Sequence, residues 1–119
     1  MSLIHAKPNE VIDVRPWGEQ LADHKTATLF KSEQIEVLRL VLPAGKVIAE
    51  HRAPGEMTIH CVEGCIAFTA AGKTQELTGG QMLYLMRGEP HALEAREPSS
   101  ALVTIVLAQT RIINTGVQR

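Results

Sequence analysis

Two histidines, His51 and His91, are the residues of this sequence whose type and surroundings best suit them to chemistry. His51 lies between glycine turns in the stretch 43–64, and His91 lies in a second stretch of the same character, residues 80–95. An imidazole binds divalent metals through a ring nitrogen, and it also acts as a general base near neutral pH. We therefore expect a pocket around both side chains. The alternative is that they are core histidines, with ring nitrogens satisfied by hydrogen bonds.

Short strands must position these histidines. Turn signals recur from residue 43 to residue 100, and the runs between them are rich in Val, Ile, Leu and Thr. Strands spaced in this way are typical of an all-β sandwich or barrel. The pattern also predicts strands over 26–31 and 34–42, and a single helical turn over 16–25 that opens with proline.

Composition narrows the function classes. The 119 residues carry 12 basic and 13 acidic side chains, so the net charge is −1. No basic stripe is visible, which argues against nucleic-acid binding, and no apolar run approaches the roughly 18 residues of a membrane-spanning helix. The N-terminus lacks a signal-peptide pattern, and two cysteines are too few for a disulfide framework. We therefore predict a cytoplasmic protein without nucleic-acid or membrane partners.

The chain is predicted to form one domain over residues 1–119. Its core barrel would span 26–109, preceded by an N-terminal arm, 1–25, and followed by a C-terminal tail, 110–119. The runs 37–42 and 101–108 are apolar on both faces, whereas a half-buried strand should alternate. One face would line the barrel and the other would be covered by a second subunit, which predicts a homodimer.

The spacing in the two stretches resembles the paired motifs of the cupin superfamily. The first cupin motif runs Gly, five residues, His, one, His, three, Glu, six, Gly, and the matching positions are Gly45, His51, Ala53, Met57 and Gly64. The second runs Gly, five, Pro, one, Gly, two, His, three, Asn, and the matching positions are Gly80, Met86, Gly88, His91 and Ala95. The resemblance implies a cupin jelly-roll, a double-stranded β-helix barrel of the RmlC-like type.

The departures from these motifs bear on the cofactor. In metal-dependent cupins the two histidines and the glutamate of the first motif hold one metal with the histidine of the second. Here Ala53 and Met57 replace two of those four ligands. Catalytic sites usually supply three protein ligands. The sequence therefore assigns no definite cofactor. The candidate is a divalent zinc, iron, manganese or nickel ion, which would have only His51 and His91 as ligands. The run 51–56 resembles a variant of small bacterial single-domain cupins with no assigned activity.

The resemblance and the strand alternation together predict a pocket that holds a small, mostly apolar molecule. Its expected lining is His51, Ala53, Met57, Ile59, Cys61, Phe68, His91 and Leu93. Two alternatives stay open. One is an enzyme, either a metal-dependent dioxygenase or isomerase like related cupins, or a metal-free catalyst that uses the two histidines. The other is a structural or regulatory dimeric module.

Cys61 and Cys65 are predicted not to form a disulfide. If Glu63 and Gly64 are the two residues of a hairpin turn, Val62 pairs with Cys65, and the two thiols lie on opposite faces of the hairpin. Arg52 is predicted to point away from the barrel.

Overall fold

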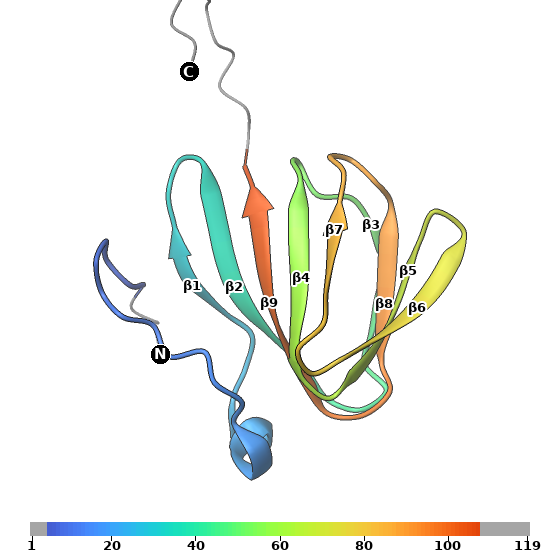
Figure 1. The fold of residues 1–119 in the computed structure, drawn as a ribbon, viewed down its shortest axis with the longest axis horizontal. Helices are drawn as coiled ribbons and strands as arrows, with labels where there is room; N and C mark the ends of the chain where they lie inside the picture. Colours follow the sequence, from blue (N-terminus) through green and yellow to red (C-terminus); the bar gives the residue numbers. More distant parts are fainter. Residues whose placement is uncertain (1–4, 108–119) are drawn as a thin grey trace, which may run out of the picture.

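The computed structural model describes residues 5–107 and shows two antiparallel sheets that face each other (Figure 1). The first sheet has the order β1-β2-β9-β4-β7, with bounds Ala27–Lys31, Ile35–Leu42, Ser99–Val106, Met57–Glu63 and Met82–Leu85. The second has the order β3-β8-β5-β6, with bounds Val47–His51, His91–Ala95, Cys65–Ala70 and Lys73–Thr78. The predicted jelly-roll barrel is confirmed.

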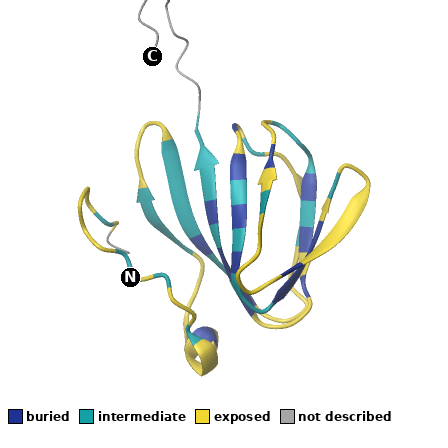
Figure 2. Cartoon of the chain, viewed as in Figure 1, coloured by how far each residue is buried: buried dark blue, intermediate teal, exposed yellow. Residues whose placement is uncertain are grey.

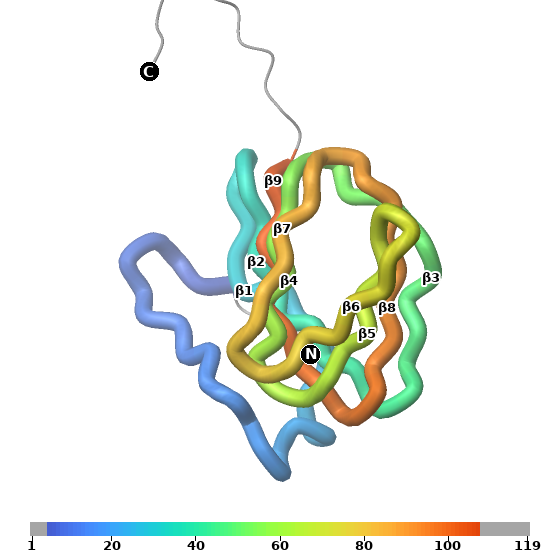
Figure 3. The backbone as a smooth tube through the Cα atoms, turned by 45° about the vertical axis from the view of Figure 1, so that its right-hand side comes forward, coloured from blue at the N-terminus to red at the C-terminus, as the bar shows by residue number. Residues whose placement is uncertain are grey.

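The core lies between the two sheets. Figure 3 shows β9, β4 and β7 as one wall of the barrel and β5, β6 and β8 as the other. Burial alternates along β4, where Met57, Ile59 and Cys61 are buried and the residues between them are only half-buried (Figure 2). Successive side chains of a strand point to opposite faces, so these three residues face the interior. Nearly all of the core is aliphatic, apart from Phe68 on β5.

The predicted elements before β3 are confirmed at nearly the expected bounds. Strands β1 and β2 match the runs 26–31 and 34–42, and the predicted helical turn is the short 3₁₀ helix η1, Gly18–Asp23. Residues 5–15, in the predicted N-terminal arm, form no strand, and one backbone hydrogen bond of 2.8 Å links Ala6 N–H to Leu29 O. Within residues 5–107, no helix is long and apolar enough to cross a membrane. The predicted tail, and the end of the run 101–108, lie outside the described residues.

The predicted hairpin at Glu63 and Gly64 is wrong. Strands β4 and β5 belong to different sheets, and neither Val62 nor Cys61 pairs with the strand that follows. The chain crosses between the sheets at Gly64, whose φ is 94°. Local turn chemistry predicts a turn at this glycine, but the pairing partners are set by strands far along the chain. Both cysteines are buried and free.

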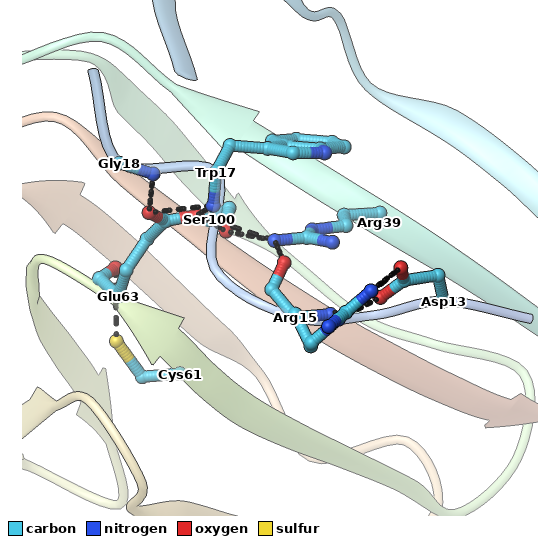
Figure 4. A network of polar contacts seen from close by, with 8 residues as sticks. All are labelled: Asp13, Arg15, Trp17, Gly18, Arg39, Cys61, Glu63 and Ser100. Carbon is cyan, nitrogen blue, oxygen red and sulfur yellow. Dashed lines mark hydrogen bonds and ion pairs between the residues drawn. The ribbon is translucent and has the colours of Figure 1, made fainter. Parts of the chain in front are cut away.

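A network of polar contacts covers the outer face of the five-stranded sheet, where the N-terminal segment crosses it (Figure 4). The guanidinium of Arg39, only 2% exposed, pairs with Glu63 at 3.2 Å and also donates to Ser100 Oγ. Glu63 accepts hydrogen bonds from the backbone N–H groups of Trp17 and Gly18. These contacts tie the N-terminal segment to β2, β4 and β9.

Two aromatic rings complete this cover. The indole of Trp17 lies 3.7 Å from the Arg39 guanidinium carbon, and His24 stacks on the indole with ring centroids 3.7 Å apart. A desolvated cation over an aromatic face gains electrostatic stabilisation, which offsets part of the cost of burying Arg39. Part of the outer face predicted to need a second subunit is therefore covered by the chain itself.

The carboxyl of Glu63 is held in its charged form. Burial alone would raise its pKa, but the hydrogen bonds from Ser100, Trp17 and Gly18, with the charge of Arg39, outweigh burial and lower the pKa. A lowered folded-state pKa means that the stabilisation is present above the unfolded value and is lost as the pH falls below it. The contribution of Glu63 is therefore complete above its ordinary pKa of 4.5 and is lost in acid.

Replacing Gly64 by alanine should destabilise the fold far more than the same change at Gly72. Both glycines have positive φ, 94° and 73°, but a Cβ at Gly64 would collide with Ser99 and the Pro98 carbonyl, whereas at Gly72 nothing lies within 4 Å. We expect Gly72→Ala to cost about 1 kcal/mol from the left-handed backbone alone, and Gly64→Ala at least about 2 kcal/mol more. Urea denaturation measures both free energies of unfolding. Equal costs would contradict the tight crossing between the sheets.

Candidate functional site

A one-residue bulge in β3 places His51 opposite His91. Ile48 pairs with Leu93 and His51 pairs with His91, so two residues of β3 oppose Ala92 alone on β8. Without the bulge, strand alternation would put Ile48 and His51 on opposite faces. With it, both point into the barrel. The bulge is also closed by a hydrogen bond of 2.9 Å between His51 Nδ1 and the carbonyl of Ala49.

Three aromatic side chains form a row across β3, β8 and β5. The ring centroids of His51 and His91 lie 4.3 Å apart in an edge-to-face arrangement, with 60° between the ring planes. On the other side of His91, the ring of Phe68 is nearly parallel at a centroid distance of 5.6 Å. His91 Nδ1 lies 2.9 Å from the carbonyl of Glu89. The His91 ring is thus held on both sides and at one nitrogen, so its position is well defined.

A cavity of about 250 Å³ opens beside the two histidines. Its walls are mostly aliphatic and come from both sheets, and its lining consists of Leu38, Leu40, Ile48, His51, Arg52, Ala53, Pro54, Met57, Ile59, His91, Leu93, Val103 and Ile105. His91 is 3% exposed, whereas His51 and Arg52 are exposed at the rim. The polar side chains of the lining are therefore two imidazoles and one guanidinium.

The structure brings together six of the eight side chains predicted for the pocket. These six are His51, Ala53, Met57, Ile59, His91 and Leu93. Cys61 and Phe68 are buried in the core and do not line the cavity, although Phe68 supports the His91 ring. The sequence reasoning omitted the wall from β2 and β9, Leu38, Leu40, Val103 and Ile105. The runs 37–42 and 101–108, which are apolar on both faces, indicated this wall, since one face of each run had to line the barrel.

Arg52, which was predicted to point away from the barrel, has an exposed side chain at the rim of the cavity. It follows the bulge directly, lines the cavity mouth and donates a hydrogen bond of 3.0 Å from Nη1 to the carbonyl of Gly88. The bulge lies between Ile48 and His51, and both His51 and Ala53 line the cavity, so the backbone still alternates across these positions and leaves the Arg52 side chain exposed. Arg52 therefore joins the end of β3 to the loop between β7 and β8.

The donor set of this cavity does not fit a catalytic metal. At the positions that hold metal in metal-dependent cupins, the chain offers His51, Ala53, Met57 and His91, so two imidazoles stand where three strong ligands are usual. No cluster of three or more His, Cys, Asp or Glu side chains suited to a metal occurs within residues 5–107. The soft thioether of Met57 is a poor ligand for zinc, iron or manganese.

A nucleophilic thiol is also absent from the cavity lining. Burial raises the pKa of the Cys61 thiol to about 11, and its Sγ lies 3.4 Å from the carbonyl of Glu63. Burial likewise raises the pKa of Cys65. A protonated thiol is a weak nucleophile, so both cysteines act as small core residues.

The family model for the cupin domain matches residues 38–107, which hold both histidines and most of the barrel strands. The chain belongs to the cupin family. This cupin gave no match among curated proteins. The resemblance drawn from the two spaced motifs is thereby confirmed.

Solved structures share this fold at low sequence identity. A conserved protein of unknown function from Streptococcus pyogenes aligns with a TM-score of 0.71 at 23% identity, over 92% of this chain and 98% of that one. A cupin superfamily protein from Desulfitobacterium hafniense aligns with a TM-score of 0.67 at 15% identity, over 87% and 84%. A salicylate 1,2-dioxygenase from Pseudaminobacter salicylatoxidans aligns at 0.58 and 22% identity, over 61% of this cupin and 21% of the dioxygenase.

Restoring the two missing ligands should create a metal site. In the double variant Ala53→His/Met57→Glu, both new side chains would face the cavity beside His51 and His91, giving a three-histidine, one-carboxylate set. We expect stoichiometric Zn²⁺ binding at micromolar protein concentration, and only weak binding by the unchanged chain. Isothermal titration calorimetry measures both. No gain in affinity would contradict the assignment of positions 53 and 57 to the motif.

Proposed function

We propose that this cupin binds a small, mostly apolar organic molecule in the cavity between its sheets. The observation that carries the proposal is a pair of imidazoles, His51 and His91, set in otherwise aliphatic walls. Apolar walls with a few fixed polar groups are the usual form of a small-molecule site, with burial giving affinity and the polar groups giving orientation. The His91 ring is held by Phe68 and Glu89, so this orientation is built before a ligand arrives.

Enzymatic alternatives receive less support from the cavity. A dioxygenase such as the salicylate enzyme named above shares the fold, but fold does not determine function. A metal-dependent enzyme needs a third strong metal ligand, such as a histidine or a glutamate, which Ala53 and Met57 do not supply. Metal-free acid–base catalysis needs only an imidazole, and it stays open as the second candidate because the two rings lie 4.3 Å apart at the cavity.

We further propose that this cupin is a homodimer that pairs through the outer face of the five-stranded sheet. Support comes from apolar side chains that lie on that face beyond the cover of Trp17. Leu102 and Val106 of β9 are only half-buried, and Met82 and Tyr84 of the edge strand β7 are 57% and 61% exposed. Exposed apolar groups of this kind on one sheet face favour association.

Toluene is a suitable probe of the cavity. We expect NMR titration with toluene to shift backbone amide signals at the lining residues, and Ala53→Leu to weaken binding about tenfold because the added carbon atoms occupy ligand volume. The control is Ala22→Leu, the same substitution on the exposed surface of η1. Toluene binding that shifts no lining residue, or that is equal in both variants, would contradict the proposed site.

Light scattering coupled to size-exclusion chromatography measures the oligomeric state. We expect a dimer for the native chain and a monomer for Leu102→Glu, because the new charge would be desolvated in the interface. Val47→Glu places the same charge on β3 of the other sheet, at a side chain that is 57% exposed, and should leave the dimer intact. A native monomer would contradict the proposed pairing.

A further inference from the structure

The hydrogen bonds of the two histidines determine which ring nitrogen carries the proton. His51 Nδ1 lies 2.9 Å from the Ala49 carbonyl, and His91 Nδ1 lies 2.9 Å from the Glu89 carbonyl. A carbonyl oxygen only accepts hydrogen bonds, so each Nδ1 must carry a proton and donate it. In the neutral ring the other nitrogen, Nε2, then has a lone pair and is an acceptor.

Neither Nε2 has a hydrogen-bond partner within residues 5–107. This matters most for His91, which is 3% exposed and lies against an aliphatic cavity wall. Nε2 of His91 is not among the buried polar atoms without a partner, so it stays accessible, and a hydroxyl inside the cavity can donate to it in apolar surroundings that strengthen a hydrogen bond. Arg52, the other polar side chain of the lining, uses Nη1 on the Gly88 carbonyl at the mouth. The cavity therefore presents acceptors that a ligand with a donor would satisfy.

The lining also restricts the charge of that ligand. No carboxylate is among the lining residues, so an ammonium group would lose its hydration without gaining a counter-charge. A carboxylate ligand placed against the imidazoles would face their two lone pairs, and the guanidinium of Arg52, the cationic group of the lining, is exposed at the rim, where water screens its charge. The site therefore favours a neutral donor, a hydroxyl above all.

The cavity volume restricts the size. An apolar cavity of about 150 Å³ is large enough to hold benzene. The present cavity, at about 250 Å³, leaves room for one ring with one or two small substituents. Its walls are aliphatic side chains from both sheets, which suit the faces of a flat ring.

We propose that the ligand is a neutral single-ring compound of the phenol class, whose hydroxyl donates a hydrogen bond to Nε2 of His91 while its ring packs against the aliphatic walls. This inference rests on the proposed function, that the cavity binds a small organic molecule. It adds the chemical class of that molecule. His51, at the rim, offers the second acceptor to a further donor on the same ring.

Four probes that share a methyl-substituted ring test this assignment by NMR titration at about pH 8, where imidazole and phenol are both largely neutral. They are p-cresol, toluene, 4-methylanisole and 4-methylbenzoate. We expect p-cresol to bind about threefold to tenfold more tightly than toluene and 4-methylanisole, because only p-cresol can donate to Nε2. The His91 ring nitrogen signal should move with p-cresol and not with toluene. We expect 4-methylbenzoate to bind most weakly.

The variant His91→Phe removes the acceptor and keeps an aromatic ring of similar shape beside Phe68. In this variant the preference for p-cresol over toluene should disappear while toluene still binds. If the variant does not fold, the ring nitrogen signal of the native chain decides the question alone, since it reports directly on a hydrogen bond at His91.

The outcomes distinguish a failure of the phenol class from a failure of the proposed function, the binding of a small organic molecule in the cavity. If toluene or 4-methylanisole binds as tightly as p-cresol, or 4-methylbenzoate binds most tightly, the phenol class is wrong and a ligand-binding cavity stands. If none of the four probes shifts the lining residues, both the phenol class and the proposed function are wrong.

Discussion

The one-residue bulge in β3 is the constraint on which the candidate site depends. It turns His51 to the same face as Ile48, and so sets its ring 4.3 Å from that of His91. Without the extra residue, one of the two imidazoles would leave the barrel and the cavity would have a single acceptor. The hydrogen bond from His51 to the Ala49 carbonyl holds the bulge and the ring together. The bulge in the backbone of β3 therefore also determines where the imidazole of His51 lies.

The opposite face of the first sheet carries the other organised contacts of this cupin. Glu63 and Arg39 join β4, β9 and β2 to the N-terminal segment, and these are the strands whose inner faces supply one wall of the cavity. A buried ion pair contributes little net stability, because desolvation offsets the attraction. Its effect is positional, since the same Glu63 carboxylate accepts hydrogen bonds from the backbone N–H groups of Trp17 and Gly18 and so fixes where the N-terminal segment lies.

Much of the fold could be predicted from the sequence, because strand length and turn residues are local properties. The motif spacing and the strand alternation also predicted six residues that line one cavity in the structure, namely His51, Ala53, Met57, Ile59, His91 and Leu93. The bulge, the sheet crossing at Gly64 and the bond from Arg52 to the Gly88 carbonyl were missed, because each depends on segments distant along the chain. The Glu63 network was missed as well, although a lone arginine in the apolar run 37–42 was a signal for a buried partner.

Long-range ¹H–¹⁵N NMR of the histidine rings is the most direct test of the central claim, that two imidazole lone pairs face an apolar cavity. The hydrogen bonds to Ala49 and Glu89 predict that, in the neutral rings, both His51 and His91 carry their proton on Nδ1 and leave Nε2 unprotonated. Spectra in which Nε2 carries the proton in both rings would contradict the account, because the cavity would then present donors instead of acceptors.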